Sequence, residues 1–246
     1  LGLAILLACG ASVLTRHRKA ISLGLAAVII ADGLIQSSGR WPRPASRVQG
    51  LAALDAIAGC DAVILSDYGK GVLSGSVIKS VIERAKELTK PIIVDPKGPD
   101  FSRYAGASFV TPNSSELSHA VGRSLNDNGS IIDAARELGI DHGIDSFLVT
   151  RSKDGLSLID RENDDHIPAK VQEVFDVSGA GDTVLSFIAA GIASSLNIES
   201  VVKIANIAAG IVVNKTGTSV AHLSEMLISA NKGAYHLSKV VELYEA

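Results

Sequence analysis

Apolar runs and helical stripes alternate along the chain from residue 61 onward. Four runs have the length and apolar character of strands in a parallel sheet buried on both faces: 61–66, 91–94, 108–111 and 146–150. Residues 156–159 and 166–168 are expected to form hairpin or edge strands. Helices are expected from residue 112 onward and at 76–89, 131–138, 182–194, 200–214, 223–231 and 237–245. This alternation predicts an α/β fold with a mainly parallel central sheet.

Each predicted strand is followed by a polar loop. Ligands of open α/β sheets bind outside the carboxyl ends of the strands. Charged or amide side chains fall at or just beyond these ends, at Asp67, Lys70, Asp95, Lys97, Asn113, Glu116, Arg151 and Asp182. Their shared position predicts a ligand site at one edge of the sheet.

The stretch E-V-F-D-V-S-G-A-G-D-T-V-L-S, residues 173–186, joins an expected strand end to a helix. Gly179 and Gly181 allow backbone conformations that a side chain would block. The turn can therefore direct N–H groups and the positive end of a helix dipole at one point, which is an anion site suited to phosphate. Asp182 is placed to deprotonate a hydroxyl that attacks a phosphoryl group, or it only caps the helix.

Composition excludes several classes of function. The 246 residues are 47% apolar, which is enough for a sizeable core. The net charge of -3 does not indicate a positively charged surface that would bind nucleic acid. Cys9 and Cys60 are too few for a disulfide framework and indicate a reducing cytoplasm. The apolar runs 1–14 and 23–35 are too short or too interrupted to span a bilayer, so buried helix or strand is expected there.

Six segments together resemble one enzyme family. D-V-S-G-A-G-D-T (176–183) is similar to the second signature of the PfkB, or ribokinase-like, carbohydrate kinases, and T-P-N-S-S-E (111–116) resembles their N-x-x-E motif. Four further segments resemble one branch of this family, the D-glycero-D-manno-heptose 7-phosphate kinases. They are S-D-Y-G-K-G (66–71), V-D-P-K-G-P-D-F-S-R-Y-A-G-A (94–107), V-T-R-S-K-D-G (149–155) and N-K-T-G-T-S (214–219). The resemblance covers about residues 51–219 and implies a three-layer ribokinase-like fold.

The resemblance implies roles at the glycine turn. Asp182 would be the catalytic base that takes the proton from the sugar hydroxyl. Gly179, Ala180 and Gly181 would form the anion hole for the transferring phosphoryl group, where charge builds in the transition state. Asp176 matches the position that binds a monovalent cation such as K⁺ in many members.

The resemblance also implies a nucleotide site. Asn113 and Glu116 would hold Mg²⁺ on the phosphates of ATP through water, because Mg²⁺ sheds its hydration shell reluctantly. The remaining candidates around the nucleotide are Lys97, Arg151, Gly155 and Asn206, while Asp67 and Lys70 are candidates for contact with the sugar.

These candidates also have purely structural interpretations. Asn113 and Glu116 have the spacing of a helix capping box. Lys97 and Arg151 could be solvated loop charges. Asn206, on an apolar helix, could be a buried amide satisfied within the protein, and Asp67 and Lys70 could simply end a strand.

Residues 1–49 do not resemble the family. They contain neither a G-G-A-A-N-V-A-like glycine signature nor the alternating strands of the lid that closes over the sugar. We therefore expect a divergent segment 1–50 followed by a kinase core 51–246, with the lid largely missing. Because phosphoryl transfer depends on positioning and a closed site, weak activity or none is expected of the chain alone. The first residue is Leu1 rather than Met, which suggests a fragment or a trimmed product.

The expected function is ATP-dependent phosphorylation of D-glycero-D-manno-heptose 7-phosphate at the anomeric hydroxyl, for lipopolysaccharide core heptose, in the cytoplasm. The expected partners are ATP, Mg²⁺ and a small sugar phosphate, without nucleic acid or membrane. The sequence does not decide whether the chain forms a homodimer or works with a fused or separate adenylyltransferase domain. The H-x-G-H motif of such a domain is absent from the sequence. The alternatives are another PfkB sugar kinase, of ribokinase or fructokinase type, and a non-catalytic nucleotide-binding remnant.

Overall fold

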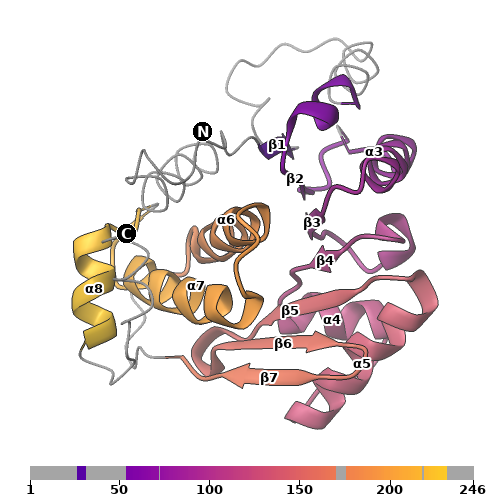
Figure 1. The fold of residues 1–246 in the computed structure, drawn as a ribbon. Helices are drawn as coiled ribbons and strands as arrows, with labels where there is room; N and C mark the ends of the chain where they lie inside the picture. The colour runs from indigo at the N-terminus through magenta and orange to yellow at the C-terminus, as the bar shows by residue number, and fades with distance from the viewer. Residues whose placement is uncertain (1–26, 32–53, 72, 170–175, 218, 232–246) are drawn as a thin grey trace. The chain divides into compact units, whose positions relative to one another are not determined.

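The computed structural model describes residues 27–31, 54–71, 73–169, 176–217 and 219–231 (Figure 1). They belong to two compact units, one within residues 26–166 and one that includes residues 167–246. The expected strand end at 173–175 and the expected helix at 237–245 lie outside the described residues.

A seven-stranded sheet forms the first unit, with its strands in chain order. The first five strands are parallel, and β6 turns back antiparallel to β5. The strands are β1 (Ala27–Ala31), β2 (Ala62–Ser66), β3 (Ile92–Asp95), β4 (Phe109–Val110), β5 (Ser146–Thr150), β6 (Leu156–Asp160) and β7 (Asp164–Ile167). All five residues of β2 are buried, as expected for an inner parallel strand, and the first four are apolar.

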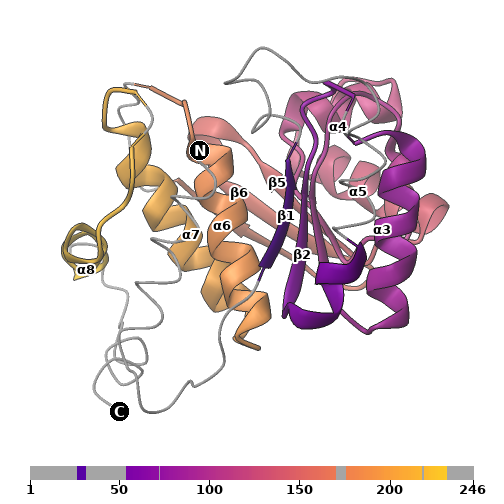
Figure 2. The ribbon, with the colours of Figure 1, turned by 90° about the horizontal axis from the view of Figure 1, so that it is seen from above.

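Helices cover one face of this sheet, as Figure 2 shows for α3, α4 and α5. The helices are α3 (Gly75–Glu87), α4 (Ser114–Val121) and α5 (Asn128–His142), and short 3-10 turns are η2 (Ile57–Gly59), η3 (Phe101–Tyr104) and η4 (Ser152–Asp154). Helix α5 begins three residues before the expected 131 because Asp127 and Ser130 form a capping box. It continues to His142, where Gly143 in the left-handed conformation ends it.

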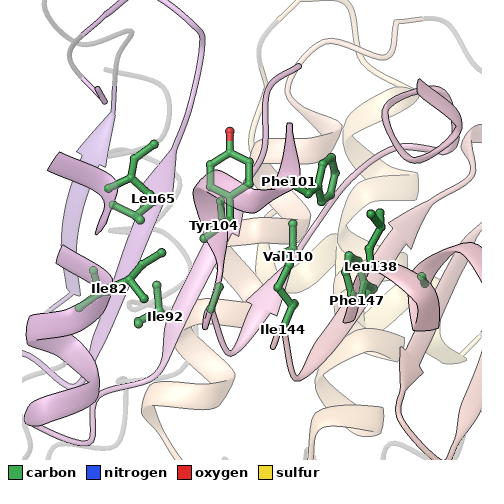
Figure 3. Packing of buried hydrophobic residues seen from close by; sticks show 14 of the residues in the cluster. Leu65, Ile82, Ile92, Phe101, Tyr104, Val110, Leu138, Ile144 and Phe147 are labelled. Carbon is green, nitrogen blue, oxygen red and sulfur yellow. The ribbon is translucent and has the colours of Figure 1, made fainter. Parts of the chain in front are cut away.

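The core of the first unit lies between the sheet and these helices (Figure 3). Turn η3 inserts two aromatic side chains into it, Phe101 and Tyr104, whose rings meet edge to face with centroids 6.0 Å apart. Phe101 also stacks on Phe147 of β5 at 6.4 Å. The run D-P-K-G-P-D-F-S-R-Y therefore begins at the end of β3, is exposed at residues 97–100 and ends in the core.

The second unit contains α6 (Ala180–Ala193), α7 (Ile198–Val213) and α8 (Leu223–Asn231). Helix α6 is apolar on nearly all sides, and its residues 183–191 are buried. It contacts α7 closely at Gly191, where an added Cβ would lie 2.3 Å from Cγ2 of Val201. A side chain at this position would force the two helices apart.

The α/β fold with a mainly parallel sheet is confirmed, and the expected elements that fall within the described residues recur with shifted ends. Part of the apolar run 23–35 forms β1, which pairs with β2 although it lies within the segment 1–50 that the sequence sets apart. Of the helices in the described ranges, none is long and apolar enough to cross a bilayer.

Candidate active site

The glycine turn at 176–182 leads directly into α6. Gly179 adopts φ +82°, which favours glycine, and occupies the N-cap position of the helix. Its carbonyl accepts from the N–H of Thr183 at 2.9 Å and from the Thr183 hydroxyl at 2.8 Å. Helix α6 therefore begins at Ala180, before the expected Asp182.

Asp182 lies half-buried in the first turn of α6. The N-cap residue is Gly179, so Asp182 is not the N-cap residue that one interpretation of the sequence made it. A carboxylate in the first turn still interacts favourably with the positive end of the helix dipole.

The expected anion hole has one donor already engaged. The N–H of Ala180 donates to the carbonyl of Val177 at 3.2 Å, so the turn itself uses this group. Gly181 is exposed, and a Cβ added there would meet no atom within 4 Å. The backbone at Gly181 is therefore open to approach by a ligand.

Asp176 ties the glycine turn to the segment after α7. Its Oδ1 accepts from the N–H of Ser178 and its Oδ2 from the N–H of Gly217, both at 2.9 Å. Its own N–H donates to the carbonyl of Val213 at 3.1 Å. The bonds from Ser178, and then that from Gly217, hold the pKa of the Asp176 carboxyl below its usual range. A carboxylate has about four acceptor positions, so this one can still serve as a ligand of a weakly bound cation.

Replacing Asp176 with Asn is expected to lower the thermal stability of the protein at neutral pH. Because the folded-state pKa of Asp176 is depressed, its stabilisation is present above the unfolded-state pKa of about 3.9 and is lost as the pH falls through the lower folded value. Thermal unfolding of the wild type and Asp176→Asn should therefore differ at pH 7 and converge in acid. Asp133→Asn, at an exposed position of α5, is the control. A constant difference at every pH would contradict this role.

Asn113 and Glu116 form the capping box that their spacing predicts. The N–H of Glu116 donates to Oδ1 of Asn113 at 2.9 Å, and the N–H of Asn113 donates to Oε2 of Glu116 at 3.0 Å. The capping interpretation is confirmed. The other carboxylate oxygen, Oε1 of Glu116, lies 3.6 Å from Nζ of Lys97, so the loop after β3 and the start of α4 meet at this ion pair.

The amide and carboxylate oxygens of Asn113 and Glu116 are ligands of the kind that Mg²⁺ prefers. In the part of the chain that the structure describes, no three His, Cys, Asp or Glu side chains gather closely enough to hold a metal by themselves. With two oxygen-donor side chains, Asn113 and Glu116 fit an ion that keeps most of its waters and is shared with substrate phosphates, as Mg²⁺ often is.

Arg151 lies at the end of β5 in a network of hydrogen bonds. Its NH1 donates to Oδ1 of Asn128 at 2.6 Å and to the Ser157 hydroxyl at 3.2 Å, and lies 3.3 Å from Nδ1 of His166. Since a guanidinium has only donors, Nδ1 of His166 accepts in this contact. Arg151 is thus held in place rather than solvated. These three partners were missed in the sequence because they come from α5, β6 and β7 and share no local motif.

Gly155 closes the loop that follows Arg151. It adopts φ +92°, and its carbonyl accepts from the N–H of Arg151 at 2.8 Å. An isolated parallel bridge between Asn113 and Thr150 places this loop beside the capping box. The loops after β4 and β5 are therefore neighbours, as the parallel sheet predicts.

Asp67 is a buried part of the framework. Its Oδ1 accepts from the N–H of Gly69 at 2.8 Å, and its Oδ2 from the hydroxyl of Tyr104 at 2.8 Å. Arg103 forms a salt bridge with Oδ2 at 3.2 Å. The strand-end interpretation describes Asp67 better than contact with a sugar does, because its side chain is fully buried. Lys70 lies on the exposed loop that follows.

Asn206 is buried on α7, and its Nδ2 donates to the carbonyl of Pro168 at 2.9 Å. This is the satisfied amide that the structural interpretation expects. The candidates thus form two groups. Asp67, Lys97, Asn113, Glu116 and Arg151 lie at the carboxyl ends of β2 to β5 in the first unit, and Asp176 to Asp182 lie at the start of α6 in the second.

A pocket of about 460 Å³ lies at the other end of the strands, lined in part by Ile140, Ile144 and the 160–163 turn between β6 and β7. It contains none of the predicted site residues. Its position at the amino end of β5 separates it from the loops described above.

A family model described as pfkB family carbohydrate kinase matches residues 41–225. The chain belongs to the pfkB family of carbohydrate kinases. The expected family and the class of phosphotransferase are thereby confirmed, and family membership supports ATP as the phosphoryl donor and a small molecule as the acceptor.

Several relatives of this pfkB chain are named bifunctional protein HldE. Those of Acidiphilium cryptum, Paramagnetospirillum magneticum and Granulibacter bethesdensis are 46%, 47% and 48% identical over 189, 171 and 182 residues. The matches cover 77%, 69% and 71% of this chain but only 39%, 35% and 38% of the relatives. The chain therefore spans about two fifths of the length of these proteins.

Solved structures confirm the ribokinase-like fold. Ribokinase of Arabidopsis thaliana, complexed with ribose and ATP, has a TM-score of 0.65 at 22% identity and covers 72% of this chain and 58% of its own. Phosphofructokinase-2 of Escherichia coli, in complex with potassium, has a TM-score of 0.67 at 18% identity, covering 75% and 62%. At such identities the similarity is one of fold.

Proposed function

We propose that this chain is the kinase part of a heptose 7-phosphate kinase. It would transfer the γ-phosphoryl group of ATP to the anomeric hydroxyl of D-glycero-D-manno-heptose 7-phosphate and form the 1,7-bisphosphate, a precursor of lipopolysaccharide core heptose. The observation that carries this proposal is the 46% identity over 189 residues to a relative named bifunctional protein HldE. The resemblance of residues 94–107 to the heptose branch supports the same substrate.

The two groups of residues would have different tasks: the second unit would act on the sugar hydroxyl and the transferring phosphoryl group, and the first unit would bind the nucleotide. Asp182 would accept the proton of the sugar hydroxyl as the attack begins, and the turn at Gly179, Ala180 and Gly181 would stabilise the charge on the phosphoryl group. The open backbone at Gly181 supports this role. Asp176 would hold K⁺ near the turn, as a neighbouring carboxylate that orders the Ser178 and Gly217 backbones.

The nucleotide would bind at the loops of the first unit. Lys97 would contact the phosphates, and Asn113 with Glu116 would hold Mg²⁺ on them through water. Arg151, fixed through its NH1 group, and Gly155 would border the nucleotide. Asn206, in the second unit, is assigned to the nucleotide by resemblance, although its Nδ2 already donates to the carbonyl of Pro168. Asp67 would not touch the substrate but would support the loops through its buried hydrogen bonds. Lys70, on the exposed loop after β2, would contact the sugar phosphate.

We also propose a setting for the reaction. We place it in the cytoplasm, where ATP and sugar phosphates are available and where the low cysteine content fits. The bifunctional name of the relatives is consistent with a second, adenylyltransferase domain, fused or separate. Size-exclusion chromatography with light scattering decides between a monomer and a homodimer.

A substrate panel tests the proposal. The purified chain is incubated with ATP and Mg²⁺ and with heptose 7-phosphate, ribose, fructose or fructose 6-phosphate, and ADP release is followed together with the phosphorylated product. We expect kcat/KM to be highest for heptose 7-phosphate, with a turnover below that of a full-length HldE. A preference for ribose or a hexose would move the chain to another branch of the family. Binding of ATP without turnover on any sugar would favour a non-catalytic remnant.

Replacing Glu116 with Gln separates capping from metal binding. An amide oxygen can still accept from the N–H of Asn113, so the capping box and the melting temperature should be nearly unchanged. Loss of the charge should raise the Mg²⁺ concentration needed for half-maximal activity by several-fold, on the order of one charge-assisted contact. Glu137→Gln, at an exposed ion pair of α5, is the matched control. An unchanged Mg²⁺ requirement would restrict Glu116 to capping.

A further inference from the structure

The hydroxyl of Tyr104 joins two loops at the carboxyl ends of neighbouring strands. Figure 3 shows its ring among buried residues and its hydroxyl directed away from Ile82 and Ile92. The hydroxyl donates to Oδ2 of Asp67, after β2, at 2.8 Å and accepts from the N–H of Lys97, after β3, at 2.9 Å. A side chain anchored in the core therefore holds both loops through one oxygen atom.

Arg103 completes the buried end of this link. One of its nitrogens, NH2, lies 3.2 Å from Oδ2 of Asp67 and donates to the carbonyl of Leu73 at 2.7 Å. Its guanidinium carbon lies 5.7 Å from the centroid of the Tyr104 ring, within the range of a cation–π contact. Asp67 also accepts from the N–H of Gly69. The buried carboxylate is thus compensated by a cation and by two further donors, as burial of a charge requires.

The exposed end of the link is the side chain of Lys97. Its backbone N–H is bound to Tyr104, while its Nζ lies 3.6 Å from Oε1 of Glu116. Glu116 in turn accepts from the N–H of Asn113 in the capping box. A continuous chain of polar contacts therefore runs from the loop after β2, through Tyr104, to the start of α4.

The chemistry of the hydroxyl suits this role. Burial, and then the hydrogen bond to Asp67, raise the pKa of Tyr104 well above its usual value, against the opposing effect of the Lys97 N–H. The hydroxyl therefore stays protonated at physiological pH and can donate to Asp67 and accept from Lys97 at the same time.

We propose that Tyr104, supported by Arg103, is a positioning residue for the nucleotide phosphates, which it serves by holding the Lys97 backbone at a fixed place. The inference rests on the proposed function, because Lys97 is the residue assigned to those phosphates. A lysine whose backbone is fixed loses less freedom when it binds a phosphate, so removing the anchor weakens ground-state binding of ATP. Such a loss appears in KM rather than in kcat.

The test is Tyr104→Phe in the full chain, assayed with MgATP and the preferred sugar of the panel. Of the hydrogen bonds that the variant loses, the one from the Lys97 N–H acts on the phosphate site. At ordinary strength, its loss predicts a rise of about five-fold in the KM for MgATP, with kcat changed by less than about two-fold. In the Lys97→Met background the same substitution should add no further rise. A role limited to core stability would lower the melting temperature in both backgrounds by the same amount and leave the KM for MgATP unchanged well below that temperature.

Two further measurements keep the outcomes distinct. Phe101→Leu disturbs the same aromatic cluster without removing a hydrogen bond, so it should lower the melting temperature and leave the KM for MgATP unchanged. Hydrogen exchange of the peptide around residues 95–100 should be faster in Tyr104→Phe than in Phe101→Leu. If the wild type binds MgATP and Tyr104→Phe keeps its KM and its exchange rate, the inference is wrong and the proposed function stands. If the wild type does not bind MgATP, both are overturned.

Discussion

Replacing Asp182 with Asn should reduce sugar phosphorylation by about 10²- to 10⁴-fold, the range that a general base contributes. The amide has nearly the same shape as the carboxylate but cannot take up the proton of the attacking hydroxyl. The residue lies half-buried in the first turn of α6, beside a turn whose Gly181 backbone is open. Because the base acts on the sugar, the affinity for MgATP should stay nearly unchanged.

The measurement pairs steady-state turnover with calorimetric titration of MgATP. Glu199→Gln is the matched control, because Glu199 is also an acidic residue in the first turn of a helix, α7, and is exposed. It should keep wild-type turnover. Equal activity of Asp182→Asn and the wild type would remove Asp182 from the reaction. A parallel loss of ATP affinity and turnover would instead indicate that the turn had been disturbed.

Replacing Gly191 with Ala is expected to destabilise the protein by about 1–3 kcal/mol, the usual cost of overpacking. An added Cβ would lie 2.3 Å and 2.6 Å from the two methyl carbons of Val201 and 3.0 Å from its Cβ. Rotation of the valine cannot relieve contacts with all three atoms, so α6 and α7 must separate. The gain in helix propensity from Gly to Ala offsets only part of this cost.

Thermal unfolding tests this prediction, with an expected fall in Tm of roughly 2–12 °C. Gly75→Ala is the matched control, since Gly75 opens α3 and an added Cβ there would meet no atom within 4 Å. It should unfold at or slightly above the wild-type temperature. Equal Tm values for the two variants would contradict the close packing of α6 on α7. If α6 shifts in Gly191→Ala, turnover should also fall, because the glycine turn opens this helix.

Local patterns predicted much of the fold and part of the site. The apolar runs located the parallel strands because inner strands are buried on both faces, and β2 is buried at every position. The capping box of Asn113 and Glu116 followed from their spacing because its two hydrogen bonds join residues within one helical turn. The glycine turn followed for the same reason. Its N-cap was misplaced, since Gly179 with positive φ rather than Asp182 opens α6.

The contacts that hold the site together could not be read in this way. As a string of letters, D-P-K-G-P-D-F-S-R-Y indicated only a resemblance to the heptose branch. In three dimensions, Tyr104 reaches Asp67 over 37 residues of chain, and Arg151 reaches Asn128 over 23. Residues so far apart in the sequence are related by no helical or strand periodicity and by no motif. The order of the strands and the path of the loops bring them together.

The sequence by itself determined the order of the elements, the position of the glycine turn before a helix and the kinase family. These features depend on short-range periodicity and on the residues of short motifs. Tertiary structure alone decided that Asp67 is a buried support, that Arg151 is held by three acceptors and that Tyr104 anchors Lys97. The physical reason is that burial and long-range hydrogen bonds arise only when the parallel strands align and bring their carboxyl-end loops together.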